Sequence, residues 1–354
     1  MAVDKELFGK MPDGSSVYLF TLYNSNGAKI QVTNYGAKIV SIFVPDRNGK
    51  LENVILGYKY LEHYLNGHSY LGATIGRVAN RIGRGQFELD GQLYRLTKNN
   101  GENHLHGGDV GFDSLLWNII ENEEQGENPS VSFQLISPDG DQGYPGKLIV
   151  TVKYSLRNDN SVKIDFTANS DRPTIVNLTN HAYFNLNPIY CENIYRHKAK
   201  FNASNFLESD ANLIPTGRTI NVDRTPLDFR QFKEIGLEID KQVEPIISTC
   251  GYDQFLVCDS YKSNELNLMA EVEEPISGRV LQVFSTFPGM QFYTSNFLDT
   301  KFPTGYGEIN SKHSSFCIEP SYFVDAPNHP NFKSIELDKD ETYNETIVYK
   351  FLTR

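Results

Sequence analysis

His181 stands in a stretch whose composition suits proton transfer: residues 177–186 read Asn-Leu-Thr-Asn-His-Ala-Tyr-Phe-Asn-Leu. The stretch starts as a β-like run, and its cluster of Asn and Thr then breaks the alternation, as expected where a strand enters a shaped loop. An imidazole in such a loop is partly solvated and oriented by its polar neighbours, so it can carry or release a proton near neutral pH. The other interpretation is a structural loop histidine.

Glu319 is a second candidate for proton transfer. It follows the apolar run Phe316-Cys317-Ile318 and precedes Pro320. A carboxyl group at the end of an apolar run is partly desolvated, which raises its pKa toward the value that a general base needs. The other interpretation is a glutamate at the rim of the fold, in solvent.

The segment Gly72–Gly85 combines glycines, which let the backbone turn sharply, with arginines, which offer planar and permanently charged donors. It lacks the Gly-Lys-Ser/Thr of a nucleotide phosphate loop. Asn80 and Arg81 are therefore candidates for a clamp on sugar hydroxyls, and a solvated turn is the alternative.

Two histidines, His104 and His106, stand two residues apart and would point to the same side of an extended chain. Two imidazoles do not make a metal site, and no third ligand follows at a recognisable spacing. We predict hydrogen-bonding histidines and no metal. The turn cluster 137–146 is typical of an ordinary loop, and Asp253 follows Gly-Tyr near the start of a strand.

Period-two patterns dominate the elements that must position these residues, and helical periodicity is not sustained over a dozen residues anywhere. Asp90-Gly91 joins two alternating runs as a hairpin, Phe87–Leu96. The other predicted strands are Val17–Tyr23, Lys29–Thr33, Ala37–Val44, Val131–Leu135, Leu148–Tyr154, Val162–Ala168, Val280–Thr286, Gln291–Thr294, Ser315–Ile318 and Glu345–Leu352.

Short helices are expected at Tyr58–Leu65 and, capped by Asp228 and ended by Gly236, at Phe229–Ile235. The polar gap Glu121–Ser130 is expected to be a surface hairpin loop. No tether or repeat divides the sequence, so we predict one all-β domain, residues 1–354, built as an antiparallel β-sandwich.

The bulk composition narrows the class of protein. The 354 residues carry a net charge of -11 with no basic block, which disfavours a nucleic-acid partner. The four cysteines form no Cys-x-x-Cys pair, and no apolar run approaches the length of a signal peptide or a membrane span. These features predict a cytoplasmic protein with reduced thiols and no membrane partner.

Together the motifs resemble the aldose 1-epimerase (galactose mutarotase) family, from Asn34–Gly36 to Asp325–Asn328. Each motif alone is weak, but their common order along nearly the whole chain is specific. The matching stretches are Gly76–Ile82, Leu105–Gly108, Gly111–Asp113 with Trp117, Asp139–Gly146, Thr179–Leu186, Pro215–Gly217, Gly251–Asp253 and Pro288–Phe297.

The resemblance implies a large antiparallel β-sandwich, the galactose mutarotase-like supersandwich, with an open cleft and neither cofactor nor metal. His181 matches the family's general acid and Glu319 its general base. Departures from the family pattern are Gln254, where a histidine often stands, and Ser321 and Val324 after the catalytic glutamate. The positions that match residues holding the sugar or the transition state are Asn80, Arg81, His106, Asp253 and Gln291.

The implied reaction is the interconversion of α and β anomers of free aldohexoses such as galactose and glucose, by a monomer or a homodimer. We expect the carboxylates of Glu319 and Asp253 to keep His181 protonated at the working pH. A non-catalytic sugar-binding module would need no acid–base pair, and a glycoside hydrolase would want two catalytic carboxyl groups. An epimerase of phosphorylated hexoses would need an added cationic patch, which the sequence does not reveal.

Overall fold

The computed structural model describes residues 2–67, 70–123, 128–187, 193–305, 307 and 309–354. Within these residues antiparallel strands dominate, and the two α-helices, α1 (Leu61–Asn66) and α2 (Ile246–Thr249), are short. The prediction of an all-β antiparallel sandwich is confirmed. In the described part of the chain, neither helix has the length or the apolar character needed to cross a membrane.

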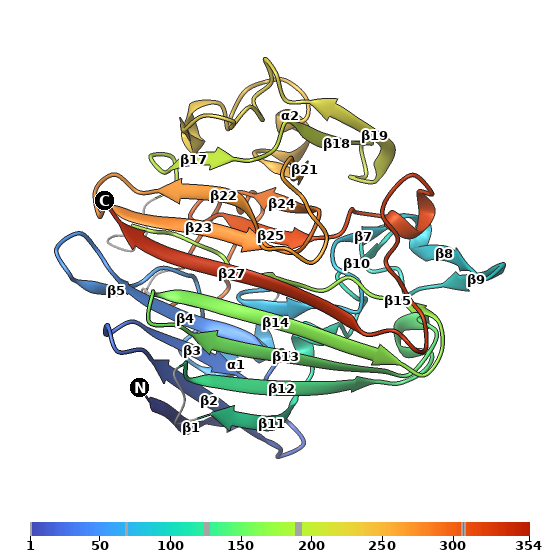
Figure 1. Ribbon diagram of the computed structural model, residues 1–354, viewed down its shortest axis with the longest axis horizontal. Helices are drawn as coiled ribbons and strands as arrows, with labels where there is room; N and C mark the ends of the chain where they lie inside the picture. The colour runs from blue at the N-terminus through green and yellow to red at the C-terminus, as the bar shows by residue number, and fades with distance from the viewer. Residues whose placement is uncertain (1, 68–69, 124–127, 188–192, 306, 308) are drawn as a thin grey trace.

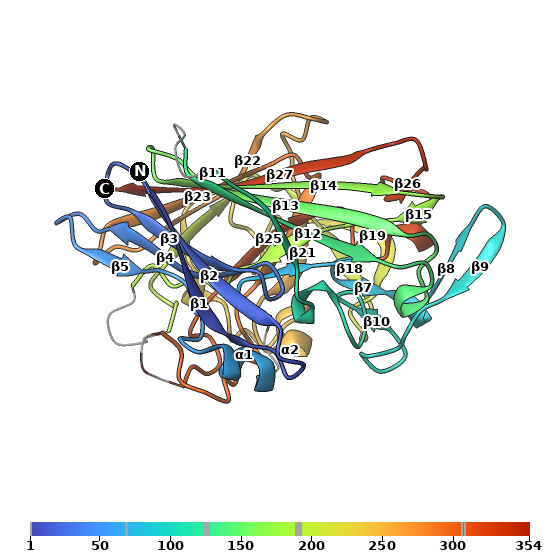
Figure 2. The same cartoon turned by 90° about the horizontal axis from the view of Figure 1, so that it is seen from below.

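The largest sheet runs across the molecule and forms one layer (Figures 1 and 2). Its nine strands, counted over the described residues, follow the order β11 (Asn118–Glu123), β12 (Ser130–Ser137), β13 (Leu148–Leu156), β14 (Ser161–Ser170), β27 (Tyr343–Thr353), β23 (Arg279–Ser285), β22 (Asn267–Glu273), β17 (Lys198–Phe201) and β20 (Lys233–Glu234).

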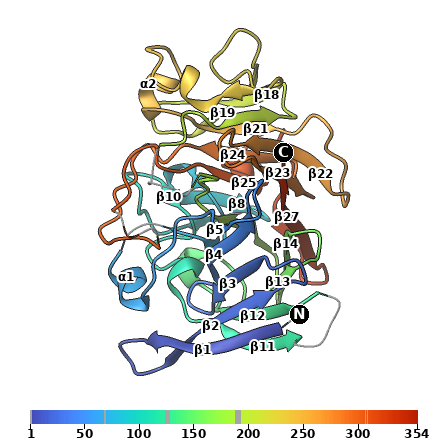
Figure 3. The ribbon, with the colours of Figure 1, turned by 90° about the vertical axis from the view of Figure 1, so that its left-hand side faces the viewer.

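Two five-stranded sheets lie beneath the largest sheet in Figure 2, and Figure 3, seen from the left-hand side of Figure 1, shows the first sheet below the second. The first contains β1 (Ala2–Lys10), β2 (Ser16–Tyr23), β3 (Lys29–Thr33), β4 (Lys38–Pro45) and β5 (Leu51–Asn53). The second has the order β19 (Pro215–Asn221), β18 (Asn205–Ser209), β21 (Asp253–Val257), β24 (Gly289–Tyr293) and β25 (Cys317–Ser321).

Short strand pairs connect the layers. They are β6 (Ala73–Ile75) with β16 (Thr179–His181), β7 (Arg81–Ile82) with β10 (His104–Leu105), β8 (Gln86–Leu89) with β9 (Gln92–Arg95), and β15 (Thr174–Ile175) with β26 (Glu336–Leu337). The 3₁₀ turns are Gly83–Gly85, Phe112–Ser114, Asp141–Gly143, Ile235–Leu237 and Ala326–Asn328.

The core lies between the layers, and alternation in the sequence places it there. On β13, Leu148, Val150 and Val152 are fully buried, while Ile149 between them is exposed. Phe133 on β12 reaches across to Phe20 on β2, with ring centroids 5.6 Å apart and an edge-to-face arrangement. Period-two patterning therefore tells which face of each strand packs on the neighbouring sheet.

Most predicted strands are confirmed, and β3 begins and ends at the predicted residues. The predicted hairpin at Asp90-Gly91 joins β8 to β9. The strand predicted at Ser315–Ile318 begins later and runs through Pro320. Proline donates no hydrogen bond to a ladder, but β25 is the edge strand of its sheet and can accept it. The loop predicted at Glu121–Ser130 does join the antiparallel pair β11 and β12, but it is shorter, because β11 runs to Glu123 and β12 begins at Ser130; residues 124–127 lie outside the described residues.

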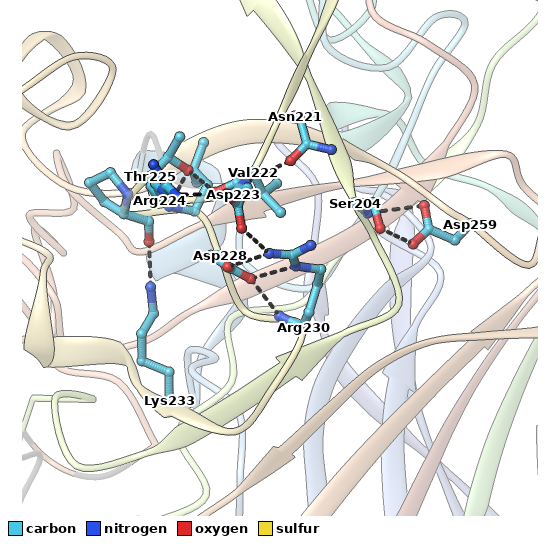
Figure 4. Close-up of polar contacts among 12 residues, drawn as sticks. Ser204, Asn221, Val222, Asp223, Arg224, Thr225, Asp228, Arg230, Lys233 and Asp259 are labelled. Atoms are coloured by element: carbon cyan, nitrogen blue, oxygen red, sulfur yellow. Dashed lines mark hydrogen bonds and ion pairs between the residues drawn. The ribbon is translucent and has the colours of Figure 1, made fainter.

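The helix predicted at Tyr58–Leu65 is confirmed as a shorter one, α1, but the helix predicted at Phe229–Ile235 is wrong. Figure 4 shows the reason: Asp228 does not cap a helix but binds the side chain of Arg230, at 2.9 Å to Nε and 2.7 Å to Nη2. Asp223 accepts a further bond from Arg230 at 2.9 Å. These side-chain contacts hold the backbone in turns, and Lys233 enters strand β20.

Candidate active site

A cavity of about 330 Å³ lies where strands of the second five-stranded sheet meet the short pairs β6–β16 and β7–β10. This volume is at the lower end of small-molecule sites. Every residue predicted to act on a substrate lines it. The lining residues are Tyr70, Asn80, Arg81, Leu105, His106, His181, Tyr183, Asp253, Gln291, Tyr293, Phe297, Leu298, Asp299 and Glu319.

Strand register explains how residues far apart in sequence meet on one wall. Residues opposite each other in antiparallel strands share a face, and so do residues two apart on one strand. Across β21, β24 and β25 the rows that follow from the pairing are Asp253–Tyr293–Cys317 and Phe255–Gln291–Glu319. The candidate base and its polar neighbours therefore come from a single sheet face.

His181 ends the short strand β16 and faces Glu319, with 3.6 Å between Nε2 and Oε1. The two side chains are only 5% and 6% exposed. Tyr183 stacks on the imidazole at 4.7 Å and 15° between ring planes, and Tyr70 lies at 5.8 Å and 19°. The ring is thus held between two aromatic faces, while its Nε2 is turned toward the carboxyl group.

Burial shifts the pKa values of the two groups in opposite directions. Desolvation raises the pKa of Glu319 well above its usual value, and the neighbouring Asp253 raises it further. Desolvation lowers the pKa of His181 to about 3. We expected attraction to carboxylates to keep His181 protonated, but in this cavity desolvation dominates. A proton shared by the pair therefore lies mainly on Glu319.

His106 and Asn80 both adopt left-handed backbone conformations, with φ of 51° and 61°. The Asn80 backbone N–H donates to Nδ1 of His106 at 3.2 Å. Since an N–H can only donate, Nδ1 is the acceptor, and the proton of this neutral imidazole is on Nε2. Burial lowers the pKa of His106 well below its usual value, so His106 is an uncharged donor at the cavity wall.

Arg81 is oriented by amide oxygens instead of by a carboxylate. Its Nε donates to Oδ1 of Asn100 at 3.1 Å, and its backbone N–H donates to Oδ1 of Asn80 at 2.8 Å. On the facing sheet, Gln291 Nε2 donates to Asp253 Oδ1 at 2.6 Å. The Oε1 of Gln291 is buried and has no partner among the described residues. The cavity therefore offers a guanidinium, a carboxyl group and a free amide oxygen, a set suited to sugar hydroxyls.

Two residues of the sequence motifs lie outside the cavity. His104 Nδ1 donates to Thr97 O at 2.6 Å, and its Nε2 is hydrogen-bonded to the Tyr144 hydroxyl at 2.7 Å. It does not share a side with His106, because the left-handed turn at His106 breaks the extended geometry. Arg77 is fully buried beneath the loop 137–146 and donates to Pro145 O at 2.8 Å. Both are structural.

The three departures from the family pattern also lie away from the cavity lining. Gln254 accepts a bond from the Asp253 backbone N–H at 2.9 Å and donates to Thr249 Oγ1 at 3.2 Å. Ser321 donates to Tyr322 O at 3.0 Å, and Val324 packs in an apolar cluster. Gln254 therefore fixes the backbone of Asp253, a residue of the cavity lining.

The aromatic wall was anticipated only as a general need for Tyr and Phe near a sugar ring. The structure identifies its members as Tyr70, Tyr183, Tyr293 and Phe297. Tyr183 had a local signal, because it stands two residues after His181 on the same stretch and so shares its face. Tyr70 carried none.

His181, Cys317 and Glu319 form one group of potential metal ligands in the described part of the chain, with ligand atoms within 4.8 Å of one another. Neither His104 nor His106 belongs to such a group among these residues.

Comparison with known proteins gives matches over nearly the whole chain. The sequence profile of the family described as aldose 1-epimerase matches residues 18–350. The galactose mutarotase of Homo sapiens is 38% identical over 352 residues, covering 99% of this chain and 98% of that protein. The aldose 1-epimerase of Haemophilus influenzae is 40% identical over 327 residues, covering 91% and 92%.

Solved structures agree with the sequence matches. The aldose epimerase homologue from C. elegans superimposes with a TM-score of 0.86 at 30% identity, covering 95% of this chain and 98% of that one. The galactose 1-epimerase from Lactobacillus acidophilus also has a TM-score of 0.86, at 27% identity, covering 99% and 98%.

Proposed function

This chain belongs to the aldose 1-epimerase family, and we propose that His181 and Glu319 are the acid and base with which it interconverts the α and β anomers of free aldohexoses. The chain is an enzyme, an isomerase of that family. The observation that carries the assignment of the pair is the 3.6 Å separation of Nε2 and Oε1 at the wall of the cavity.

That separation suits the reaction. Opening the ring of an aldose removes the proton of the C1 hydroxyl and delivers a proton to the ring oxygen, and both oxygens are bonded to C1. Two groups that act on neighbouring oxygens must themselves be neighbours. The pair carries one proton, which lies mainly on Glu319 at rest; in the minor state with that proton on His181, Glu319 takes the first proton and His181 gives the second. When the aldehyde recloses from its other face, the two exchange roles.

The remaining polar groups hold the sugar and the charge that develops on it. Arg81 and the uncharged donor His106 stabilise negative charge on oxygen as the ring opens. Asp253 accepts from sugar hydroxyls, Gln291 accepts through its free Oε1, and Asn80 orients Arg81 and His106 through its side-chain oxygen and its backbone N–H. The tyrosines pack on the apolar face of the ring.

The charges favour an unphosphorylated substrate. The cavity lining contains three carboxyl groups, Asp253, Asp299 and Glu319, and one guanidinium, Arg81. A phosphate group there would meet more acidic than basic side chains. We therefore propose galactose and glucose as substrates, in keeping with the names of the galactose mutarotases that this chain resembles.

Polarimetry tests the proposal directly. Freshly dissolved α-galactose and α-glucose should approach equilibrium rotation faster with the protein than without it. A non-catalytic sugar-binding module would bind both sugars without accelerating either. Faster turnover of hexose 6-phosphates than of the free sugars would instead favour an epimerase of phosphorylated hexoses.

We also propose a single domain over residues 1–354, a monomer or homodimer, and a reducing compartment such as the cytoplasm. One continuous apolar cluster from Val3 to Phe351 supports the single domain. Three free cysteines in the described residues, Cys250, Cys258 and Cys317, support the reducing compartment. Light scattering on the purified protein decides the oligomeric state.

A further inference from the structure

Cys317 is a buried thiol beside the proposed acid–base pair, and the mechanism gives it no role. It stands two residues before Glu319 on β25, so both side chains leave the same face of the strand. Its side chain is fully buried, and it lies in the row of Tyr293 and Asp253, next to the row of Gln291 and Glu319. Cys317 therefore lies close to the pair but does not line the cavity.

The side chains of His181, Glu319 and Cys317 bring three potential metal-ligand atoms together: an imidazole nitrogen, a carboxylate oxygen and a thiol sulfur. All lie within 4.8 Å, and Nε2 is 3.6 Å from Oε1. Tetrahedral zinc, with bonds of about 2.0–2.3 Å, needs ligand atoms about 3.3–3.8 Å apart. The His–Glu edge already meets this spacing, and a side-chain movement of about 1 Å brings the sulfur to it.

We propose that His181, Cys317 and Glu319 bind a thiophilic divalent cation such as Zn²⁺, and that this cation inhibits the enzyme by occupying its acid and base. The fourth coordination position faces the cavity, since His181 and Glu319 line it and Cys317 does not. On binding, the Cys317 thiol and the Glu319 carboxyl group each release a proton to solvent, and no group is oxidised or reduced. The inhibition of turnover rests on the proposed function. The binding of the cation does not rest on it.

The ligand chemistry sets the selectivity. A thiolate and an imidazole favour Zn²⁺, Cd²⁺ and Co²⁺, whereas Mg²⁺ and Ca²⁺ prefer oxygen ligands alone. Because the cation takes the two groups that must contact the sugar, inhibition should be competitive: KM for galactose rises with Zn²⁺ and kcat does not change. EDTA should restore the original rate, and Mg²⁺ at the same concentration should have no effect.

The matched variants are Cys317→Ser and Cys250→Ser, because Cys250 is an exposed free thiol outside the cavity lining. Cys317→Ser should weaken Zn²⁺ inhibition by at least about 10- to 100-fold, the range for loss of even an outer-shell partner of a metal. Cys250→Ser should be inhibited as the wild type is. Equal inhibition of the Cys317→Ser variant and the wild type would overturn the assignment of Cys317.

A direct reading of the metal separates this proposal from the proposed function. Co²⁺ added to the protein should produce a thiolate-to-metal charge-transfer absorption in the wild type and in Cys250→Ser, but not in Cys317→Ser. If Cys317→Ser does not fold, titration of the wild-type band with galactose decides, since the sugar should displace the cation. No band, or a band that galactose leaves unchanged, overturns the metal site. Loss of the acid–base assignment would instead appear as an active Glu319→Gln variant.

Discussion

Arg77 and Arg81 belong to one motif and stand four residues apart. They lie in two regions that differ in whether the buried polar groups are hydrogen-bonded within the protein. Beneath the loop 137–146, Arg77 Nη1 donates to Pro145 O at 2.8 Å and to Gly146 O at 3.0 Å, and Nη2 donates to Ser137 Oγ at 2.6 Å. Only its Nε is left without a partner in the described residues. Polar groups buried there are nearly all satisfied within the protein.

Around the cavity the groups are buried but not satisfied. Nε2 of His181 and Oε1 of Glu319 stand 3.6 Å apart, too far for a hydrogen bond, and no described residue bonds to Oε1 of Gln291. Arg81 is half-buried, and within the described residues its side-chain hydrogen bonds go to the amide oxygens of Asn100 and Asn80. The difference shows where a buried polar group serves stability and where it is held ready for a ligand.

The strongest test of this contrast is Glu319→Gln. The amide keeps the size of the side chain but cannot take a proton, so the rate of mutarotation should fall by about 100- to 10,000-fold. Stability should not fall: a carboxyl group with a raised pKa favours the folded state most at low pH and loses that contribution as pH rises, and an amide has no such loss. Polarimetry and urea unfolding at pH 7 measure both. A variant with more than about a third of the wild-type rate would place the base elsewhere.

Replacing Arg77 should lower stability, whereas replacing Arg81 should lower activity. Arg77→Met leaves several carbonyl and hydroxyl groups unpaired in the interior and should lower the free energy of unfolding by about 3 kcal/mol, while the folded fraction keeps its activity. Arg81→Met should leave stability unchanged and lower kcat/KM by about 10- to 100-fold, the value of a hydrogen bond to a charged group.

Denaturant unfolding and initial rates on both variants check this pair. The contrast breaks if Arg81→Met is as unstable as Arg77→Met, or if folded Arg77→Met loses activity to the same degree.

The pH dependence follows from the opposed pKa shifts. The pair works while it carries one proton, so kcat/KM should follow a bell. A second proton must enter at His181, whose pKa is about 3, so the acid limb should lie below about 4.3, the pKa of a free glutamate. The alkaline limb is the loss of the shared proton, at the raised pKa of Glu319. Beyond each limb the rate should fall about tenfold per pH unit.

Initial rates from about pH 3.5 to 10, with circular dichroism at each pH to exclude unfolding, measure the profile. An acid limb near about 6.5, the pKa of a free imidazole, would mean that the ionisation assigned here to the pair is wrong.

A smaller effect is expected from the aromatic stacking on His181. Tyr183→Leu keeps an apolar wall but removes the ring face that favours an imidazolium, which is worth about 0.5–2 kcal/mol. We expect kcat to fall by about 2- to 30-fold with little change in KM, and Tyr183→Phe should restore it. If leucine and phenylalanine variants are equally impaired, the ring is not the operative feature.

Removal of metal ions is expected to have no effect on the rate. The mechanism uses only side chains for proton transfer and charge stabilisation, so dialysis of the protein against EDTA should leave the rate unchanged. A loss that one divalent cation restores would contradict the unassisted acid–base mechanism.

Much of the fold could be predicted because apolar residues alternate wherever a strand lies between two layers, as on β12, β13 and β14. Strands without that pattern were not anticipated: β1 is largely exposed, and β19 contains Pro215 and Gly217. At Asp228 a capping signal was overridden by a local ion pair with Arg230.

The residues of the candidate site could be predicted from motifs, but not their protonation. The pKa directions depend on how completely the second five-stranded sheet and the tyrosines exclude water, and that is set by packing among segments distant in sequence. The two-residue spacing puts Cys317 on the strand face of Glu319, but its closeness to His181 depends on how the separate strands β16 and β25 pack, which the sequence does not show.

The strand β27 lies between β14 and β23 in the largest sheet and is hydrogen-bonded to both. A ribosome therefore delivers the two flanking strands well before the one that joins them, and until then each presents an open, apolar edge to the cell. Nascent chains should be most prone to aggregation in the interval between the synthesis of β23 and the synthesis of β27.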